Sequence, residues 1–395
     1  MTTVRYPPPP GPPPSLHTGV RYAPPPGPPP QMYATPPGPP QNATELSTFV
    51  RNSLVPLASR GWLSVPLPPD LESIYTHLFA QSAAFFALDP DSPDKTKFAA
   101  PPGKSASDEG FADIPGEKQL ITLRRVSGMP ELLRDAATEA WTATGKLFID
   151  TVRNIAESLE LENLDAFDLM SAEADPDPET GGFPQEKRAS SLLRLFRYDR
   201  PPRGTPTSKA VVAEAHKDLG ILTLVVGQSP GLDARDPATG QWVSVEDGAP
   251  GRLTATLLAG QTLSYLTRGL YASGVHRVSV LPPPTPAPAD AHRFSLVFAL
   301  RPAAAAPINT DVFAASHLIG PFPDAVLSDK PNNFPQCRMQ DQPASLLFKC
   351  ISEKHWNVNI APEEREAQKK SIAAGGMGQG QGERETPQQE TAEGR

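Results

Sequence analysis

Cysteine is scarce in this sequence, which has only Cys337 and Cys350 among its 395 residues. So few cysteines exclude a disulfide scaffold and fit a reducing compartment. Long apolar segments are also missing, since no run approaches the roughly 18 residues that cross a bilayer. The first residues, MTTVRYPPPPGPPP, lack the apolar core of a secretory signal. We therefore expect a cytoplasmic protein without a membrane partner.

Positive charge is in deficit, because 36 lysines and arginines stand against 44 aspartates and glutamates, a net charge of −8. The basic residues form no dense stripe along the chain, which argues against a nucleic-acid partner. We expect a small-molecule ligand and a monomeric protein.

Proline is abundant and unevenly spread, with seventeen of the fifty prolines in the first 40 residues. There VRYPPPPGPPP at 4–14 recurs as VRYAPPPGPPP at 20–30. Such a segment cannot bury apolar surface, so residues 1–44 are predicted to be a disordered tail rich in polyproline II. The tail is interpreted either as a ligand for SH3- or WW-type domains or as a solubilising segment without a partner. Residues 363–395, ending in GGMGQGQGERETPQQETAEGR, indicate a second, flexible tail.

Residues 45–185 have helical character. Apolar residues recur with a helical period in 45–61, 70–88 and 129–161. Asp70 is expected to cap the second of these helices. The region is therefore predicted to form a helical N-terminal layer.

Residues 186–302 change to short β-prone runs separated by turn residues. The runs are SLLRLFRY, AVVAEAH, ILTLVVG, LDARD, WVSVE, LTATLLAG, HRVSVL and FSLVFALR. Many short strands without intervening helices are typical of an antiparallel sandwich such as a jelly roll. The predicted fold is mainly β with flanking helices (α+β), in which a jelly-roll (double-stranded β-helix) core packs against the helical layer.

Three side chains at the ends of these runs predict a metal site. His216 and Asp218 are two positions apart, so on a strand they point the same way. His276 opens a later β-prone run, HRVSVL. Two imidazoles and one carboxylate on one face form the facial triad that binds non-haem Fe(II) and leaves positions open for substrate and oxygen. The alternative interpretation is a satisfied polar cluster at a strand end.

Arg293 and Ser295, in HRFSLVFALRP, share a face of the last strand. Arginine offers a planar fork of donors that matches a carboxylate, and serine adds a hydroxyl. A buried arginine near a metal site would be costly without an anion, so the pair predicts an acidic cosubstrate. The alternative for Arg293 is a structural ion pair.

These motifs together resemble the isopenicillin N synthase-like branch of the Fe(II)/2-oxoglutarate dioxygenases. The resemblance covers about residues 45–302 and rests on these matches in order: Tyr198 in LLRLFRYDRPP, His216-Lys217-Asp218, GLDARDPATGQWVSV, His276-Arg277-Val278 and Arg293-Phe294-Ser295. Three features depart from the family pattern. Phe196 stands where the family often has asparagine, Asp199-Arg200 replaces the proline that follows the tyrosine, and PPPTPAPADA lengthens the loop before Arg293.

The resemblance implies that Fe(II) is held by His216, Asp218 and His276. It implies that 2-oxoglutarate chelates the iron and is bound by Arg293, Ser295 and Tyr198. With O2, the reaction would yield succinate, carbon dioxide and hydroxylation or desaturation of a C–H bond of a small organic substrate, such as a specialised metabolite. The core would comprise residues 186–302, and residues 303–362 would cover the mouth of the barrel.

Two other functions remain open from the sequence. Relatives that use no 2-oxoglutarate bind the carboxylate of their own substrate with Arg-x-Ser and act as oxidases, and a catalytically inert scaffold would act through its proline-rich tail. The sequence does not identify the substrate or separate hydroxylation from desaturation or cyclisation. His17, His77, His317 and His355 lack ligand spacing and are expected in surface or packing roles.

Overall fold

The computed structural model describes residues 39–100, 109–174, 183–200, 210–247, 252–280, 292–327, 335 and 337–374. Within them, two antiparallel sheets carry the strand orders β1-β9-β6-β11-β4-β3-β2 and β5-β10-β7-β8, and β12 pairs with β13. The predicted fold class, a jelly-roll core flanked by helices, is confirmed.

All eight β-prone runs of the region 186–302 form strands, three further strands come from the N-terminal region, and two short strands come from the segment after residue 302. The strands are β1 (Trp62–Pro66), β2 (Gly110–Ile114), β3 (Lys118–Leu123), β4 (Leu192–Tyr198), β5 (Ala210–His216), β6 (Leu222–Gly227), β7 (Leu232–Arg235), β8 (Trp242–Ser244), β9 (Thr254–Ala259), β10 (His276–Val280), β11 (Arg293–Leu300), β12 (Pro307–Ile308) and β13 (Gln342–Pro343).

The helices precede, interrupt and follow these strands. They are α1 (Ala43–Asn52), α2 (Leu54–Arg60), α3 (Pro69–Ala87), α4 (Pro93–Thr96), α5 (Glu131–Ser158), α6 (Asp168–Ser171), α7 (Gln261–Leu266), α8 (Thr310–Ala314), α9 (Ala344–Ser352) and α10 (Pro362–Ala373), with short 3₁₀ turns at Val126–Gly128, Leu164–Phe167 and Ala172–Ala174. Among the described residues, no helix combines the length and the apolar character needed to cross a membrane.

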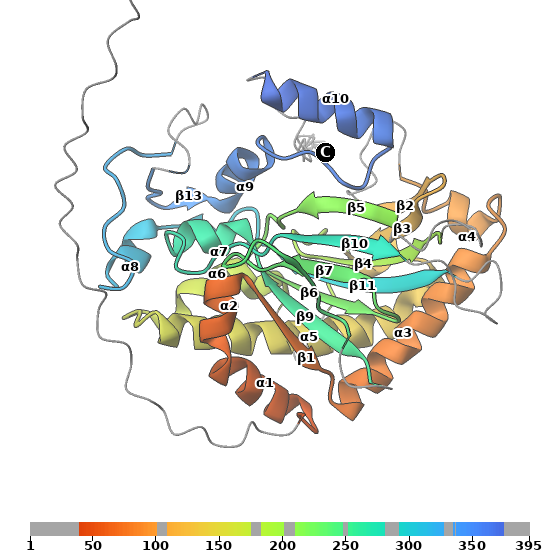
Figure 1. Ribbon diagram of the computed structural model, residues 1–395, viewed down its shortest axis with the longest axis horizontal. Helices are drawn as coiled ribbons and strands as arrows, with labels where there is room; N and C mark the ends of the chain where they lie inside the picture. Colours follow the sequence, from red (N-terminus) through yellow and green to blue (C-terminus); the bar gives the residue numbers. More distant parts are fainter. Residues whose placement is uncertain are drawn as a thin grey trace, which may run out of the picture. The chain divides into compact units, whose positions relative to one another are not determined.

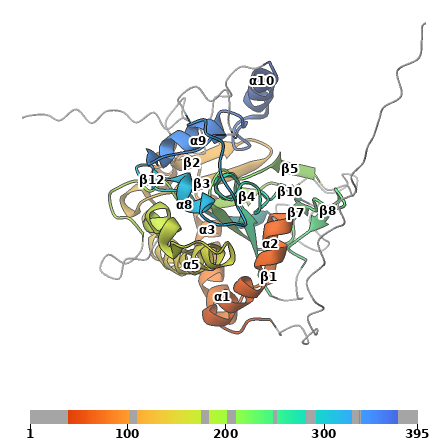
Figure 2. The same cartoon turned by 90° about the vertical axis from the view of Figure 1, so that its left-hand side faces the viewer.

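Helix α5 packs against α3 and against strand β11 of the larger sheet. Its buried stripe recurs every three or four residues and includes Leu133, Ala137, Ala140, Trp141, Thr144, Phe148, Val152 and Ile155. Trp141 lies 4.5 Å from Phe298 of β11, measured between ring centroids. Each large apolar side chain buried in this way stabilises the fold by about 1.5–3 kcal/mol. In Figures 1 and 2, α5 lies on one side of the sheets and α10 on the opposite side, near β5.

Three sequence expectations are corrected by the structure. Asp70 does not cap α3, because the helix begins at Pro69 and Pro68 occupies the cap position. The region 45–185 is not wholly helical, since β1, β2 and β3 join the seven-stranded sheet. β3 is buried along its whole length, so its sequence has no alternating pattern that would mark a strand.

The third correction concerns the predicted flexible tail at 363–395, because helix α10 spans Pro362–Ala373. The helix is held by its buried Arg365, which bonds Glu117 and Glu214 of the core. Tertiary contacts of this kind stabilise a helix that its sequence alone would leave marginal. Residues 375–395 and most of the predicted tail at 1–44 lie outside the described residues.

Candidate metal centre

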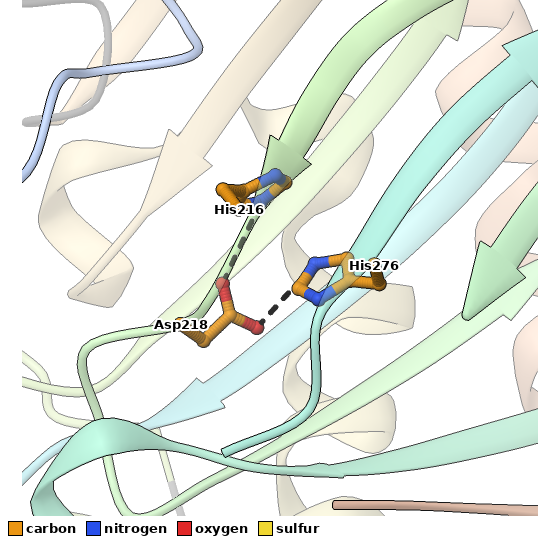
Figure 3. A group of neighbouring side chains, drawn as sticks. All are labelled: His216, Asp218 and His276. Atoms are coloured by element: carbon orange, nitrogen blue, oxygen red, sulfur yellow. Dashed lines mark ion pairs between the residues drawn. The ribbon is translucent and has the colours of Figure 1, made fainter. Parts of the chain in front are cut away.

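The structure brings the three predicted metal ligands together at one end of the smaller sheet (Figure 3). His216 ends β5, Asp218 follows two residues later, and His276 begins β10. β5 and β10 are antiparallel neighbours, and His276 lies directly opposite His216 in the register. One ligand atom from each of the three residues lies within 4.8 Å of the other two.

The imidazoles are oriented so that each turns its Nε2 atom toward Asp218. The Nε2 atom of His216 lies 3.9 Å from one carboxylate oxygen, and that of His276 lies 3.9 Å from the other (Figure 3). Each Nδ1 atom faces a backbone carbonyl, Glu214 at 2.7 Å and Gly274 at 3.3 Å. Donation from Nδ1–H to these carbonyls fixes the tautomer and leaves the Nε2 lone pairs for a metal.

The charge states also suit a divalent cation. Burial, followed by the facing His276, lowers the pKa of His216 to about 3. Burial alone would raise the pKa of Asp218, but the two imidazoles outweigh it and hold that pKa below its ordinary value. The Oδ2 atom of Asp218 is buried without a hydrogen-bond partner among the described residues. A neutral His216 imidazole, an ionised Asp218 carboxylate and an unsatisfied buried oxygen fit a bound metal ion.

The three residues line a cavity with an empty volume of about 1020 Å³, part of it open solvent. Its walls come from the inner faces of β4 and β11, from the smaller sheet and from residues 352–359. Apolar side chains predominate on the strands, and the polar groups that line it besides the triad include Arg194, Tyr198, Ser295, Arg301, His355, Asn357 and Asn359. An apolar cavity with a few converging polar groups is typical of a small-molecule site.

Ser295 and Tyr198, two of the predicted cosubstrate residues, lie in the wall of this cavity. Their hydroxyl groups share a hydrogen bond, and burial raises the pKa of Tyr198 to about 12. The phenol is therefore a neutral donor at physiological pH.

Arg293, the third predicted cosubstrate residue, is placed differently. It lies opposite Tyr198 in the β4–β11 register, and its guanidinium carbon lies 5.3 Å from the centroid of the Tyr198 ring. It is not among the residues that line the cavity. Its Nη2 atom donates to both carboxylate oxygens of Glu246, at 2.9 and 2.8 Å, and both side chains are buried. Its Nη1 atom has no partner among the described residues, so one donor remains for an anion.

His292, next to Arg293, takes no part in the triad. Its Nδ1 atom lies 3.3 Å from a carboxylate oxygen of Asp199. His355, by contrast, corrects the expectation of a surface or packing role, because it lines the cavity and its Nε2 atom lies 2.8 Å from the side-chain oxygen of Gln261. It was missed because a single histidine in SEKHWNVN has no ligand spacing.

The C-terminal wall of the cavity is tied to the core by two buried cations. Lys118 of β3 donates to the carbonyls of Val212, at 3.2 Å, and Val358, at 2.8 Å. Arg365 of α10 donates to Glu117 at 2.7 Å, to Glu214 at 3.4 Å and to the carbonyl of Ile360 at 3.1 Å. These bonds hold residues 352–359 against the cavity, although the sequence contains no motif that marks either cation.

Lys118 is expected to make stability depend on pH. Burial lowers its pKa to about 7, against an ordinary value of 10.5 that describes the unfolded chain. Between these pH values the unfolded chain binds more protons, so stability increases with pH and the penalty is largest below about pH 7. The free energy of unfolding of the wild type should rise relative to that of Lys118→Met by about 2 kcal/mol from about pH 7 to about pH 9. Urea denaturation at several pH values measures this gap, and a constant gap would contradict the expectation.

Replacing Arg365 by methionine is expected to loosen residues 352–361. The variant loses charged hydrogen bonds worth about 1.5–3 kcal/mol, so amide hydrogen exchange in this segment should accelerate at least about tenfold. Lys370→Met, on an exposed position of the same helix, is the matched control and should leave exchange unchanged. Equal exchange in the two variants would mean that Arg365 does not anchor the wall.

Comparisons with known proteins agree with this fold. No protein-family model matches the chain. The 2-oxoglutarate-dependent dioxygenase citB of Monascus ruber is 31% identical over 115 residues, which is 28% of this chain and 33% of that protein. The clavatol oxidase claD of Penicillium crustosum is 37% identical over 90 residues, 22% of this chain and 26% of that protein. The matched part thus spans about a third or less of either relative.

Solved structures are similar over more of the chain. A full-length protein of Neurospora crassa, solved in complex with alpha-KG and thymine, aligns with a TM-score of 0.56 at 17% identity, covering 80% of this chain and 93% of that one. A putative 2OG-Fe(II) oxygenase family protein of Caulobacter crescentus aligns with a TM-score of 0.54 at 21% identity, covering 78% and 94%. At such identities the likeness shows a shared fold.

Proposed function

We propose that this protein is a non-haem Fe(II)- and 2-oxoglutarate-dependent oxygenase that oxidises a C–H bond of a small organic substrate. The observation that carries the proposal is the convergence of His216, Asp218 and His276 on one point of the cavity wall. The fold shared with a 2OG-Fe(II) oxygenase family protein and the partial similarity to curated dioxygenases support it. Membership of the isopenicillin N synthase-like branch is part of the proposal.

The residues of the chain have separate roles in this reaction. When bound, Fe(II) and 2-oxoglutarate supply the oxidising chemistry, which consumes O2 and turns 2-oxoglutarate into succinate and carbon dioxide. His216, Asp218 and His276 would hold the metal through three of its positions and leave the rest open. Ser295 and Tyr198 would donate hydrogen bonds to the cosubstrate from the wall, and Arg293 would offer it the Nη1 atom.

The substrate is proposed to be a specialised metabolite that carries polar oxygen groups. Val225, Val278 and Val297 give the cavity apolar walls, and His355 and Asn359 add polar side chains within it. Donors in an otherwise apolar cavity orient a ligand through its oxygen atoms. The clavatol oxidase of Penicillium crustosum named above is in keeping with such a substrate class.

The proposal is tested by reconstituting the purified protein with Fe(II) under anaerobic conditions and then admitting O2. Metabolites that accumulate in a deletion strain serve as candidate substrates. Succinate should form only when 2-oxoglutarate is present, in step with oxidised product. Product without 2-oxoglutarate would favour the oxidase alternative. Absence of Fe(II) binding, with function lost on deletion of residues 1–44, would favour the scaffold.

A further inference from the structure

The guanidinium of Arg293 is almost fully occupied by groups of this chain. Its Nε atom donates to the carbonyl of Ser229 at 3.0 Å, and its Nη2 atom donates to both carboxylate oxygens of Glu246. The exposed fractions of the two side chains are 0% and 2%. The pair is therefore a buried, charge-balanced unit, and Nη1 is the remaining donor of Arg293 without a partner among the described residues.

Backbone features around the pair show that it is built into the fold. The amide of Leu232 donates to Glu246 Oε2 at 2.7 Å and holds the carboxylate in place. A Cβ atom at Gly227 would lie 2.3 Å from Glu246 Oε1 and 2.6 Å from Arg293 Nη2, and one at Gly231 would lie 2.4 Å from Arg293 Nε. A side chain at either position would have to displace the ion pair, since Cβ atoms essentially never approach so closely.

We propose that Glu246 determines the affinity and selectivity of the cosubstrate site by occupying Arg293 in place of an external carboxylate. This inference rests on the proposed function and deepens it. A free guanidinium binds one carboxylate group of a dicarboxylate through two parallel N–H···O hydrogen bonds. Because Glu246 occupies Nη2, the donors that remain for the far carboxylate of 2-oxoglutarate are Nη1 of Arg293 and the hydroxyl groups of Ser295 and Tyr198. The negative charge of Glu246 also repels that carboxylate from the other side of the guanidinium.

Two consequences follow from this arrangement. Glu246 keeps Arg293 paired and in position when no cosubstrate is bound, which avoids an uncompensated buried charge. It also weakens the contribution of the far carboxylate to binding, so the site discriminates little between 2-oxoglutarate and a 2-oxo acid that lacks this group. Glu246 is a positioning residue, because it acts on the cosubstrate through Arg293.

Glu246→Gln tests the proposal, because glutamine keeps the shape and an acceptor but removes the charge. We expect 2-oxoglutarate to bind this variant at least about tenfold more tightly than the wild type. The reason is that the repulsion between two unit charges close together in a buried site exceeds the free energy that corresponds to a tenfold change in affinity. Calorimetric titration of 2-oxoglutarate into the anaerobic Fe(II)-loaded protein gives the dissociation constants. The matched control is Asp233→Asn, which neutralises another buried carboxylate that pairs with an arginine, Arg277, and should leave the constant unchanged.

A measurement on the wild type keeps the test independent of whether the variant folds. Dissociation constants of 2-oxoglutarate and of 2-oxobutanoate, which lacks the far carboxylate, should differ by less than about tenfold. A difference above about a hundredfold, or equal affinity of Glu246→Gln and wild type for 2-oxoglutarate, would refute the role of Glu246 and leave the proposed function standing. If neither protein binds 2-oxoglutarate while both bind Fe(II), the cosubstrate is wrong and the inference falls with it.

Discussion

Replacing His276 by alanine is expected to abolish Fe(II) binding at this site together with substrate oxidation. The site then has two donors, His216 and Asp218, where a facial triad needs three. Because loss of a partner outside the ligand shell already costs about 10–100-fold in metal affinity or activity, loss of a ligand should cost more than about a hundredfold in both. Anaerobic calorimetry measures the loss in Fe(II) affinity, and the rate of product formation in air measures the loss in activity.

The matched control for this variant is His355→Ala. His355 lines the same cavity but is not part of the triad, and it pairs with Gln261. Its removal should leave Fe(II) affinity within about threefold of the wild type, although substrate binding can change. Wild-type affinity in His276→Ala, or an equal loss in both variants, would contradict the assignment of the metal ligands.

Arg293→Met is expected to destabilise the fold by about 3–5 kcal/mol, because it leaves Glu246 charged and buried without its partner. The substitution removes two charged hydrogen bonds as well as the countercharge. The double variant Arg293→Met/Glu246→Gln should recover more than half of this loss, since no uncompensated charge remains and glutamine can still accept from the amide of Leu232.

Urea denaturation of the wild type, the two single variants and the double variant completes a thermodynamic cycle. The expected coupling free energy exceeds about 2 kcal/mol, within the range for residues that share one network. If the free energy of unfolding lost in the double variant equals the sum of the losses in the two single variants, the Arg293–Glu246 contact does not contribute the stability assigned to it.

Much of the framework of the candidate metal centre could be predicted from the sequence because its signals are local. The alternation of β11 places Arg293 and Ser295 on one face, and the two-residue spacing of His216 and Asp218 is independent of the rest of the fold. Strands β4 to β11 each have a β-prone run bounded by turn residues, so their existence was predictable.

Other parts could not be predicted, because their signal lies in contacts between distant segments. β3 is buried on both faces, and its sequence has no strand periodicity. α10 has the polar composition of a flexible tail, and the contact that holds it joins Arg365 to Glu117, 248 positions away in the chain. His355 has no neighbouring ligand in sequence and reaches the cavity because Lys118 and Arg365 hold its segment against the core.

The sequence by itself determined the donor types of the candidate metal centre and the strands that carry them, because side-chain chemistry and strand periodicity are properties of neighbouring residues. The tertiary structure alone decided what surrounds Arg293. Glu246 lies 47 positions away and meets it because the segments around β7, β8 and β11 pack together there. Electrostatic energy depends on separation in space and on burial, so whether this arginine faces an external anion or one of the chain's own carboxylates is settled by packing.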